Sequence, residues 1–153
     1  MSRIVFVIAL LLAAGMSPAL SQNPSEAQLP PQPAVKPAWM PHGALMLSPC
    51  VQGMGEHWGA PKTLPYGPIY GVMKGKPVFV EVMISQKDFA DGKSFREALK
   101  PLPGTRIDHV DIEFEPHGHH GFAAPHYDVH GYFVAHNVHG AFCPDGIPNT
   151  TSP

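Results

Sequence analysis

Two segments in which apolar and polar side chains alternate place the strongest constraint on this fold. They span residues 107–115 and residues 126–134. Alternation with a period of two is typical of β-strands, because successive side chains of a strand point to opposite faces. Each segment therefore predicts a strand with one largely apolar face and one face rich in histidine and carboxylate side chains.

An antiparallel pairing of these two segments brings their polar faces together. Residues opposite each other in a sheet lie on the same face, and a slip of one residue inverts every side chain. Matching the two apolar faces requires odd positions of the first segment to lie opposite even positions of the second, and a register with Asp111 opposite His130 satisfies this. This register gathers six ionisable side chains on one face: Asp111, Glu113, Glu115, His126, Asp128 and His130.

Two further strand candidates precede this hairpin, at residues 69–73 and 77–84. The short turn between them contains Gly75, which tolerates the positive φ that a tight hairpin needs. The pattern predicts an antiparallel connection here.

One helix start is visible in the sequence. Ser94 is followed three residues later by Glu97, the spacing of a capping box, which predicts a short helix over residues 94–99. Pro101 would end it. We therefore predict a mainly β, antiparallel domain, a sandwich or small barrel, with one short helical insert.

The composition divides the chain into four parts. Residues 1–21 combine Arg3, an uncharged apolar run and small residues before a possible cleavage point. This pattern predicts a secretory signal peptide. The apolar run is shorter than the roughly 20 residues that a membrane span needs. Residues 22–44 are rich in proline, which predicts an extended linker outside the core. Residues 45–143 form the β-rich domain, and residues 144–153 are expected to be a loose tail.

The two cysteines, Cys50 and Cys143, lie near the two ends of the predicted domain. In an exported protein the expected state is a disulfide, although two free thiols or two metal ligands remain open. We expect a periplasmic or secreted location with no membrane anchor after cleavage. The formal net charge of −2 provides no basic footprint for nucleic acid, so none is expected as a partner.

The polar hairpin face is unfavourable without compensation, because like charges opposite each other in a sheet repel. Water, histidine protonation or a bound cation would relieve the repulsion, and imidazole with carboxylate suits zinc, manganese, iron or copper. The connecting loop adds His117, His119 and His120, and its glycines allow His117 or His119 to fold back over the face. The predicted metal ligands are His117, His119, His126, Asp128 and His130, with His57, Glu81 and Glu113 as secondary candidates.

The geometry of a strand limits this site. His126 and His130 are four residues apart, about 13 Å on a straight strand, so they cannot share one ion without a bulge. No spacing in the chain matches a specific zinc motif. His109 and His139 are expected to lie outside the site, and a simply solvated face would need no metal at all.

Two of the secondary candidates come from outside the hairpin. Residues 55–58 predict a loop that places His57 beside an acid and an aromatic residue, where a packed Trp58 and a hydrogen-bonded His57 are the plainer alternative. Glu81 sits within the apolar strand at 77–84. A carboxylate there is either at the surface or buried with a partner such as His57.

Five groups of residues between positions 49 and 143 carry a resemblance to a known family. They are Cys50 with Met54-Gly55-Glu56-His57-Trp58; Gly67-Pro68-Ile69-Tyr70-Gly71; Gly75-Lys76-Pro77-Val78-Phe79 with Glu81; Pro116-His117-Gly118-His119; and Pro125-His126-Tyr127-Asp128 with His130, Tyr132 and Phe133. With them the chain resembles the TTHB-two-ten-like family of exported bacterial domains of unknown function. His120 and Gly131 depart from the family pattern. The resemblance implies a β-rich exported domain and brings no established activity, substrate or cofactor.

Three functional interpretations follow. The first is an exported metal-binding or small-ligand-binding protein, with zinc, manganese, iron or copper as the expected cofactor. The second is a metal-dependent enzyme with a histidine and carboxylate pocket. The third is a structural envelope protein that self-assembles as a homo-oligomer through its apolar hairpin face.

Overall fold

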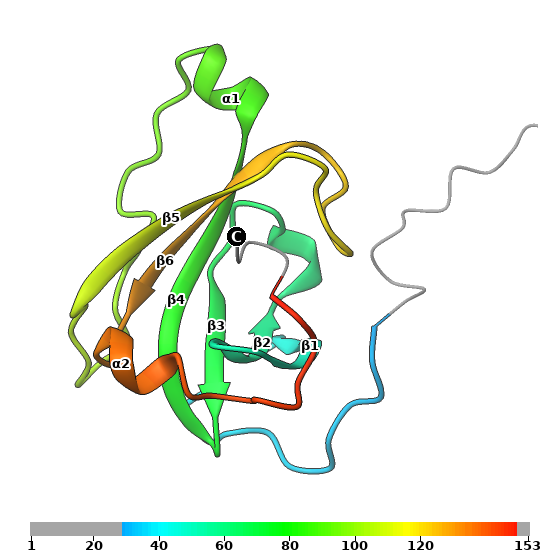
Figure 1. Ribbon diagram of the computed structural model, residues 1–153, viewed down its shortest axis with the longest axis vertical. Helices are drawn as coiled ribbons and strands as arrows, with labels where there is room; N and C mark the ends of the chain where they lie inside the picture. The colour runs from blue at the N-terminus through cyan, green and yellow to red at the C-terminus, as the bar shows by residue number, and fades with distance from the viewer. Residues whose placement is uncertain (1–28, 150–153) are drawn as a thin grey trace, which may run out of the picture.

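A single six-stranded antiparallel sheet dominates the computed structural model, which describes residues 29–149 (Figure 1). The predicted signal peptide lies outside the described residues. The sheet has the order β1-β2-β3-β4-β6-β5, so it is open and ends at β1 and β5. This confirms the mainly β, antiparallel fold, in the form of one curved sheet instead of two stacked sheets or a closed barrel. The strands are β1 (Leu45–Val51), β2 (Gly55–Gly59), β3 (Ile69–Met73), β4 (Lys76–Ser85), β5 (His109–Glu115) and β6 (His126–Tyr132).

The helical segments are short: η1 (Pro61–Thr63), α1 (Gln86–Ala90) and α2 (His136–His139). The helix predicted at residues 94–99 is wrong. The helix in this part of the chain is α1, which begins after Ser85, whose hydroxyl accepts a hydrogen bond from the backbone amide of Asp88. Glu97 has a positive φ of 53°, which a continuing helix does not allow.

The pairing of β5 with β6 has the register that the alternating pattern predicts. Strand β4 flanks β6 on its other side, so Glu81 also lies opposite His130. Three strands thus contribute ionisable side chains to one face. The pairs on β5 and β6 are Asp111 with His130, Glu113 with Asp128, and Glu115 with His126.

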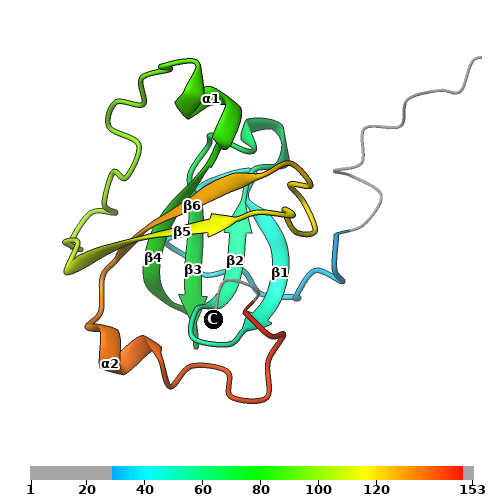
Figure 2. The same cartoon turned by 45° about the horizontal axis from the view of Figure 1, so that its top comes forward.

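The polar face of this hairpin is the buried one. His126, Asp128 and His130 are 0%, 5% and 1% exposed. The alternative in which this face is simply solvated is therefore wrong for these three residues. The apolar side chains of β5 lie on the exposed face of the sheet. The sheet curls so that β5 and β6 cross in front of β2 and β3, with the ionisable face on the inside (Figure 2).

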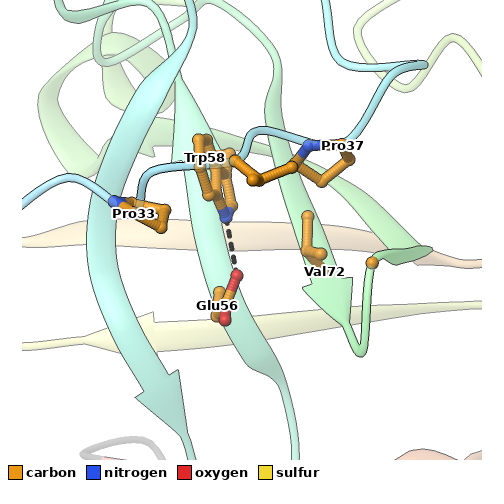
Figure 3. Close-up of a pocket in the computed structure, with 7 residues that line it drawn as sticks. Pro33, Pro37, Glu56, Trp58 and Val72 are labelled. Atoms are coloured by element: carbon orange, nitrogen blue, oxygen red, sulfur yellow. Dashed lines mark hydrogen bonds between the residues drawn. The ribbon is translucent and has the colours of Figure 1, made fainter.

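The described part of the predicted linker packs on the opposite face of the sheet. Figure 3 shows Pro33 and Pro37 beside Trp58 and Val72, around a small pocket of about 210 Å³. Further along, Met40 is only 6% exposed and belongs to the same apolar cluster as Trp58. The expectation that this stretch stays outside the core is wrong, because its few large apolar residues cover β2 and β3.

A disulfide joins Cys50 of β1 to Cys143, as predicted. The chain beyond it returns to β1, where the Ile147 amide donates to the Cys50 carbonyl and the Gln52 amide donates to the Ile147 carbonyl, both at 2.9 Å. Residues 144–149 are therefore held against the sheet and do not form a loose tail. Within residues 29–149, no helix is long and apolar enough to cross a membrane.

Candidate metal and ligand site

A pocket of about 710 Å³ opens on the concave face of the sheet. Apolar side chains such as Leu47, Ile69 and Met83 line its walls, and Phe122 closes it from the loop between β5 and β6. In both views this loop bends towards the β1 side of the sheet (Figures 1 and 2). The ionisable lining residues are His57, Glu81, Glu115, His119, His120, Asp128 and His130.

The first group of ionisable residues in the pocket is the Glu81 triad, formed by His57, Glu81 and His130. Each comes from a different strand, β2, β4 and β6. The Nε2 atoms of His57 and His130 lie 3.8 Å and 3.6 Å from Glu81 Oε2. On its other side, His130 Nδ1 lies 3.3 Å from Glu113 Oε2. The His130 ring is thus held between two carboxylates.

Electrostatics sets the charge of this triad. Burial opposes the charged form of His130, but the charge of Glu81 and the contact with Glu113 outweigh it and raise its pKa to about 10. Burial likewise disfavours the Glu81 carboxylate, yet His130 and His57 outweigh that effect and lower its pKa to about 2. Burial lowers the pKa of His57. At neutral pH the triad is a buried ion pair with a neutral histidine beside it.

An aromatic ring fixes the two histidines of this triad. The Phe79 ring lies edge-on to both His57 and His130, with centroid distances of 5.1 Å and 4.9 Å. The ring occupies the space over Gly71, where an added Cβ would lie 2.3 Å from it. A glycine at position 71 is therefore required for this arrangement.

The second group is the Asp128 triad, formed by His119, His126 and Asp128. Strand β6 supplies His126 and Asp128, and the loop before it supplies His119. His126 Nε2 lies 3.1 Å from both His119 Nε2 and Asp128 Oδ1. His119 Nε2 lies 3.5 Å from Asp128 Oδ2. Two imidazole nitrogens and a carboxylate thus converge on one point.

Backbone contacts orient both rings of the Asp128 triad. His126 Nδ1 is 2.6 Å from the Ala124 carbonyl, and His119 Nδ1 is 2.9 Å from the His120 carbonyl. Because a carbonyl only accepts hydrogen bonds, each Nδ1 carries the proton. The two Nε2 atoms then face each other with lone pairs, which requires either a proton or a metal ion between them.

In the absence of a metal, the proton occupies this position. Burial disfavours a charged His119, but its contacts with Asp128 and the His120 carbonyl outweigh burial and raise its pKa to about 9. A protonated His119 donates to Asp128 or His126. A metal ion would have to displace this proton.

The structure separates the sequence-predicted residues into distinct groups. His126 and His130 lie in different triads, in keeping with their spacing along the strand. His117 is exposed and belongs to neither triad. Residues 55–58 form most of β2 and not a loop, which places His57 in the sheet. His109 and His139 lie outside both triads, but they form a third cluster with Asp111 and His136 that the sequence pattern did not predict.

Buried polar atoms without a hydrogen bond gather in these groups. Within residues 29–149 they include Glu81 Oε2, Asp128 Oδ1 and both ring nitrogens of His130, whose contacts are ionic. Leaving a buried polar atom without a hydrogen bond costs roughly 1–3 kcal/mol. The concave face therefore relies on ionic contacts where an ordinary protein interior has hydrogen bonds.

Comparisons with known proteins identify a similar domain but indicate no activity. A family model described as "TTHB210-like: Hypothetical protein TTHB210" matches residues 72–114. A solved structure, the crystal structure of hypothetical protein TTHB210 from Thermus thermophilus, is 26% identical with a TM-score of 0.51. The match covers 75% of this chain and 95% of that one. None of the curated proteins matches this chain.

Proposed function

Because the chain carries a TTHB210-like domain, whose function is unknown, we propose a function from its geometry. We propose that it is an exported protein that binds a divalent transition metal at the Asp128 triad, below a pocket that admits a small ligand. The disulfide supports a location in an oxidising compartment.

The convergence of His119 Nε2, His126 Nε2 and Asp128 carries this proposal. Ligand atoms around a tetrahedral zinc ion lie about 3.3 Å apart, given bonds of about 2.0–2.1 Å. The two Nε2 atoms are 3.1 Å apart, His126 Nε2 is 3.1 Å from Asp128 Oδ1, and His119 Nε2 is 3.5 Å from Asp128 Oδ2. Both imidazoles also donate their other ring N–H to a backbone carbonyl, the outer contact that metal-bound histidines ordinarily have.

The Glu81 triad has a different role in this proposal. His130 is held as a cation between two carboxylates, so its ring nitrogens are not free to bind a metal at neutral pH. Its charge compensates the carboxylates of the concave face. We therefore assign His130 to the charge balance of the pocket and not to the metal.

The pocket defines the ligand chemistry. Its walls are apolar, while its polar groups gather around the two triads. A molecule with an apolar body and a metal-binding or hydrogen-bonding head group suits such a pocket. Three protein ligands leave a coordination position open for that head group.

Metal titration of the purified, untagged protein tests this proposal. We expect wild-type protein to bind zinc or copper, and His119→Ala to lose one bound ion per chain. His117→Ala is the matched control, because His117 lies in the same loop but is exposed and outside both triads. Equal binding by wild type and His119→Ala would overturn the proposal.

The enzyme interpretation has one observation in its favour. A neutral His57 and the Glu81 carboxylate share the pocket with the Asp128 triad, so an acid–base group lies near the proposed metal. Turnover of ester or phosphoester substrates by the zinc-loaded protein, lost in His57→Gln with metal retained, would favour an enzyme over a binding protein.

Self-assembly also has one observation in its favour. Val110, Ile112 and Phe114 are 48%, 64% and 41% exposed on β5, which is an edge strand of the sheet. Exposed apolar edge strands are ready sites for association with another chain. Sedimentation of wild type against Ile112→Lys tests this, since a monomer in both would remove the interpretation.

A further inference from the structure

A third group of ionisable residues lies at the opposite end of β5 from the loop that carries His119. It is the His139 cluster, formed by His109 and Asp111 of β5 and by His136 and His139 of α2. One potential ligand atom from each residue lies within 4.8 Å of the others. None of these residues belongs to the two triads of the pocket.

Local structure explains why these four side chains meet. His109 and Asp111 are two apart on a strand, so both point to the concave face. His136 and His139 are three apart on one helical turn, so they share a face of α2. The chain places this turn directly after β6, the neighbour of β5.

The distances fit a single ion. His139 Nε2 and His136 Nδ1 are 3.2 Å apart, and Asp111 Oδ2 is 3.7 Å from His109 Nε2 and 3.9 Å from His136 Nδ1. Tetrahedral zinc ligands lie about 3.3 Å apart. Small rotations of the His136 side chain, which is 78% exposed, and of Asp111, which is 32% exposed, would close the remaining gaps.

Two of the imidazoles are already oriented as metal ligands. His139 Nδ1 lies 2.7 Å from the Gly53 carbonyl, and His109 Nδ1 lies 3.1 Å from Asp108 Oδ2. Each acceptor holds the proton on Nδ1 and leaves Nε2 with a lone pair that points into the cluster. His109 Nε2 is buried there without a hydrogen bond.

Ring stacking holds the same two imidazoles in place. The Tyr132 ring stacks on His139 at 3.9 Å and on His109 at 4.9 Å between centroids. The cluster therefore has two fixed histidines, and His136 is the adjustable member. A site of this kind is largely formed before a metal arrives.

We propose that His109, Asp111, His136 and His139 form a second metal site, for zinc or another divalent transition metal of similar ligand preference. Imidazole ligands favour zinc, copper, iron and nickel. Four protein ligands fill a tetrahedral shell, which is typical of a structural site. The ion would clamp the short helix α2 to the edge strand β5.

Metal counting in single-site variants tests this inference independently of the proposed pocket site. We expect untagged wild-type protein to hold two zinc or cobalt ions per chain, and His136→Ala and Asp111→Asn to hold one. Cobalt absorption should lose the contribution of a four-coordinate site in both variants. His42→Ala is the matched control, since His42 is an exposed histidine outside every cluster.

A milder variant tests the contact between Asp108 and His109 Nδ1, which lies outside the ligand atoms. Asp108→Asn removes the carboxylate beside His109 without removing a ligand, so affinity at this site should fall roughly 10–100-fold while the count of two ions is retained at saturating metal. His136→Ala should weaken binding by more. Both positions are substantially exposed, so these changes should not unfold the protein.

The outcomes separate the two proposals. Loss of an ion in His136→Ala but not in His119→Ala supports the His139 cluster and contradicts the pocket site. Loss only in His119→Ala overturns the second site. Unchanged metal content and affinity in His136→Ala, Asp111→Asn and Asp108→Asn would overturn it as well.

Discussion

Glu81 on β4 lies directly opposite His130 on β6, and 3.6 Å separates Glu81 Oε2 from His130 Nε2. Both side chains are almost fully buried. Each therefore depends on the charge of the other, and removing either charge takes away the directly opposite partner of a buried ion.

This pair makes the stability of the metal-free protein depend on pH. Glu81 has a lowered pKa, so its contribution is present above the ordinary value of 4.5 and is lost as the pH falls towards 2. His130 has a raised pKa, so its contribution is present below 6.5 and is lost as the pH rises towards 10. We expect the free energy of unfolding to be highest between these windows, about pH 4.5 to 6.5, in denaturation with a chelator present.

A substitution of His130 tests whether this residue causes the loss of stability at alkaline pH. His130→Gln should lower stability at pH 6 and reduce the fall in stability between pH 6.5 and 10, whereas His42→Gln should change neither. Identical pH profiles in wild type and His130→Gln would contradict the ion pair.

Metal binding at the Asp128 triad should compete with a proton. The raised pKa of His119, about 9, means that a metal must displace one proton at neutral pH. The apparent affinity should therefore fall by about tenfold for each pH unit below 9. Titrations at pH 6, 7 and 8 in a His136→Ala background measure this slope at one site. An affinity that is constant above pH 6.5 would show that His119 is neutral.

The segment before β1 should contribute measurably to stability. Met40 is 6% exposed against the cluster that contains Trp58, so Met40→Ala should cost about 2–5 kcal/mol of unfolding free energy. Val35→Ala is the control, because Val35 is 81% exposed, and it should change stability by less than about 0.5 kcal/mol. Urea denaturation compares the two. Equal effects would mean that this segment does not belong to the core.

The disulfide should be a large contributor to stability. It closes a loop with a sequence separation of 93 between Cys50 and Cys143. In the chain-entropy model a loop of this length contributes about 4–5 kcal/mol. The double variant Cys50→Ser, Cys143→Ser should lose an amount of this order in urea denaturation. Two alkylatable thiols in unreduced wild-type protein would contradict the pairing.

The alternating pattern of β5 and β6 was enough to predict the parity of their pairing, because only odd positions opposite even positions match both faces, and the register proposed within that parity is the one observed. It could not predict which face is buried. Alternation is the same whether the apolar side faces in or out. The curvature contributed by β1 to β4 determines which face of the hairpin is buried. The outcome is unusual, with Ile112 64% exposed while His130 is 1% exposed.

The membership of the site depended on contacts that no local pattern reveals. His130 meets Glu81 because β6 lies between β4 and β5, which strand periodicity does not specify. The His139 cluster did have a readable pattern. His109 and Asp111 alternate on a strand, and His136 and His139 are one helical turn apart, but recognising them together required the position of α2.

The concave face has a consequence for how its ions would interact. Asp111 lies opposite His130, and Asp128 lies two residues before it on β6, so His130 neighbours one residue of each proposed metal site. A dication at either site repels the imidazolium proton of His130. Binding at either site would therefore lower the pKa of His130, and a protonated His130 would in turn weaken binding at both sites, because the coupling is reciprocal. The protonation of one buried histidine would thus be linked to the occupancy of both proposed metal sites.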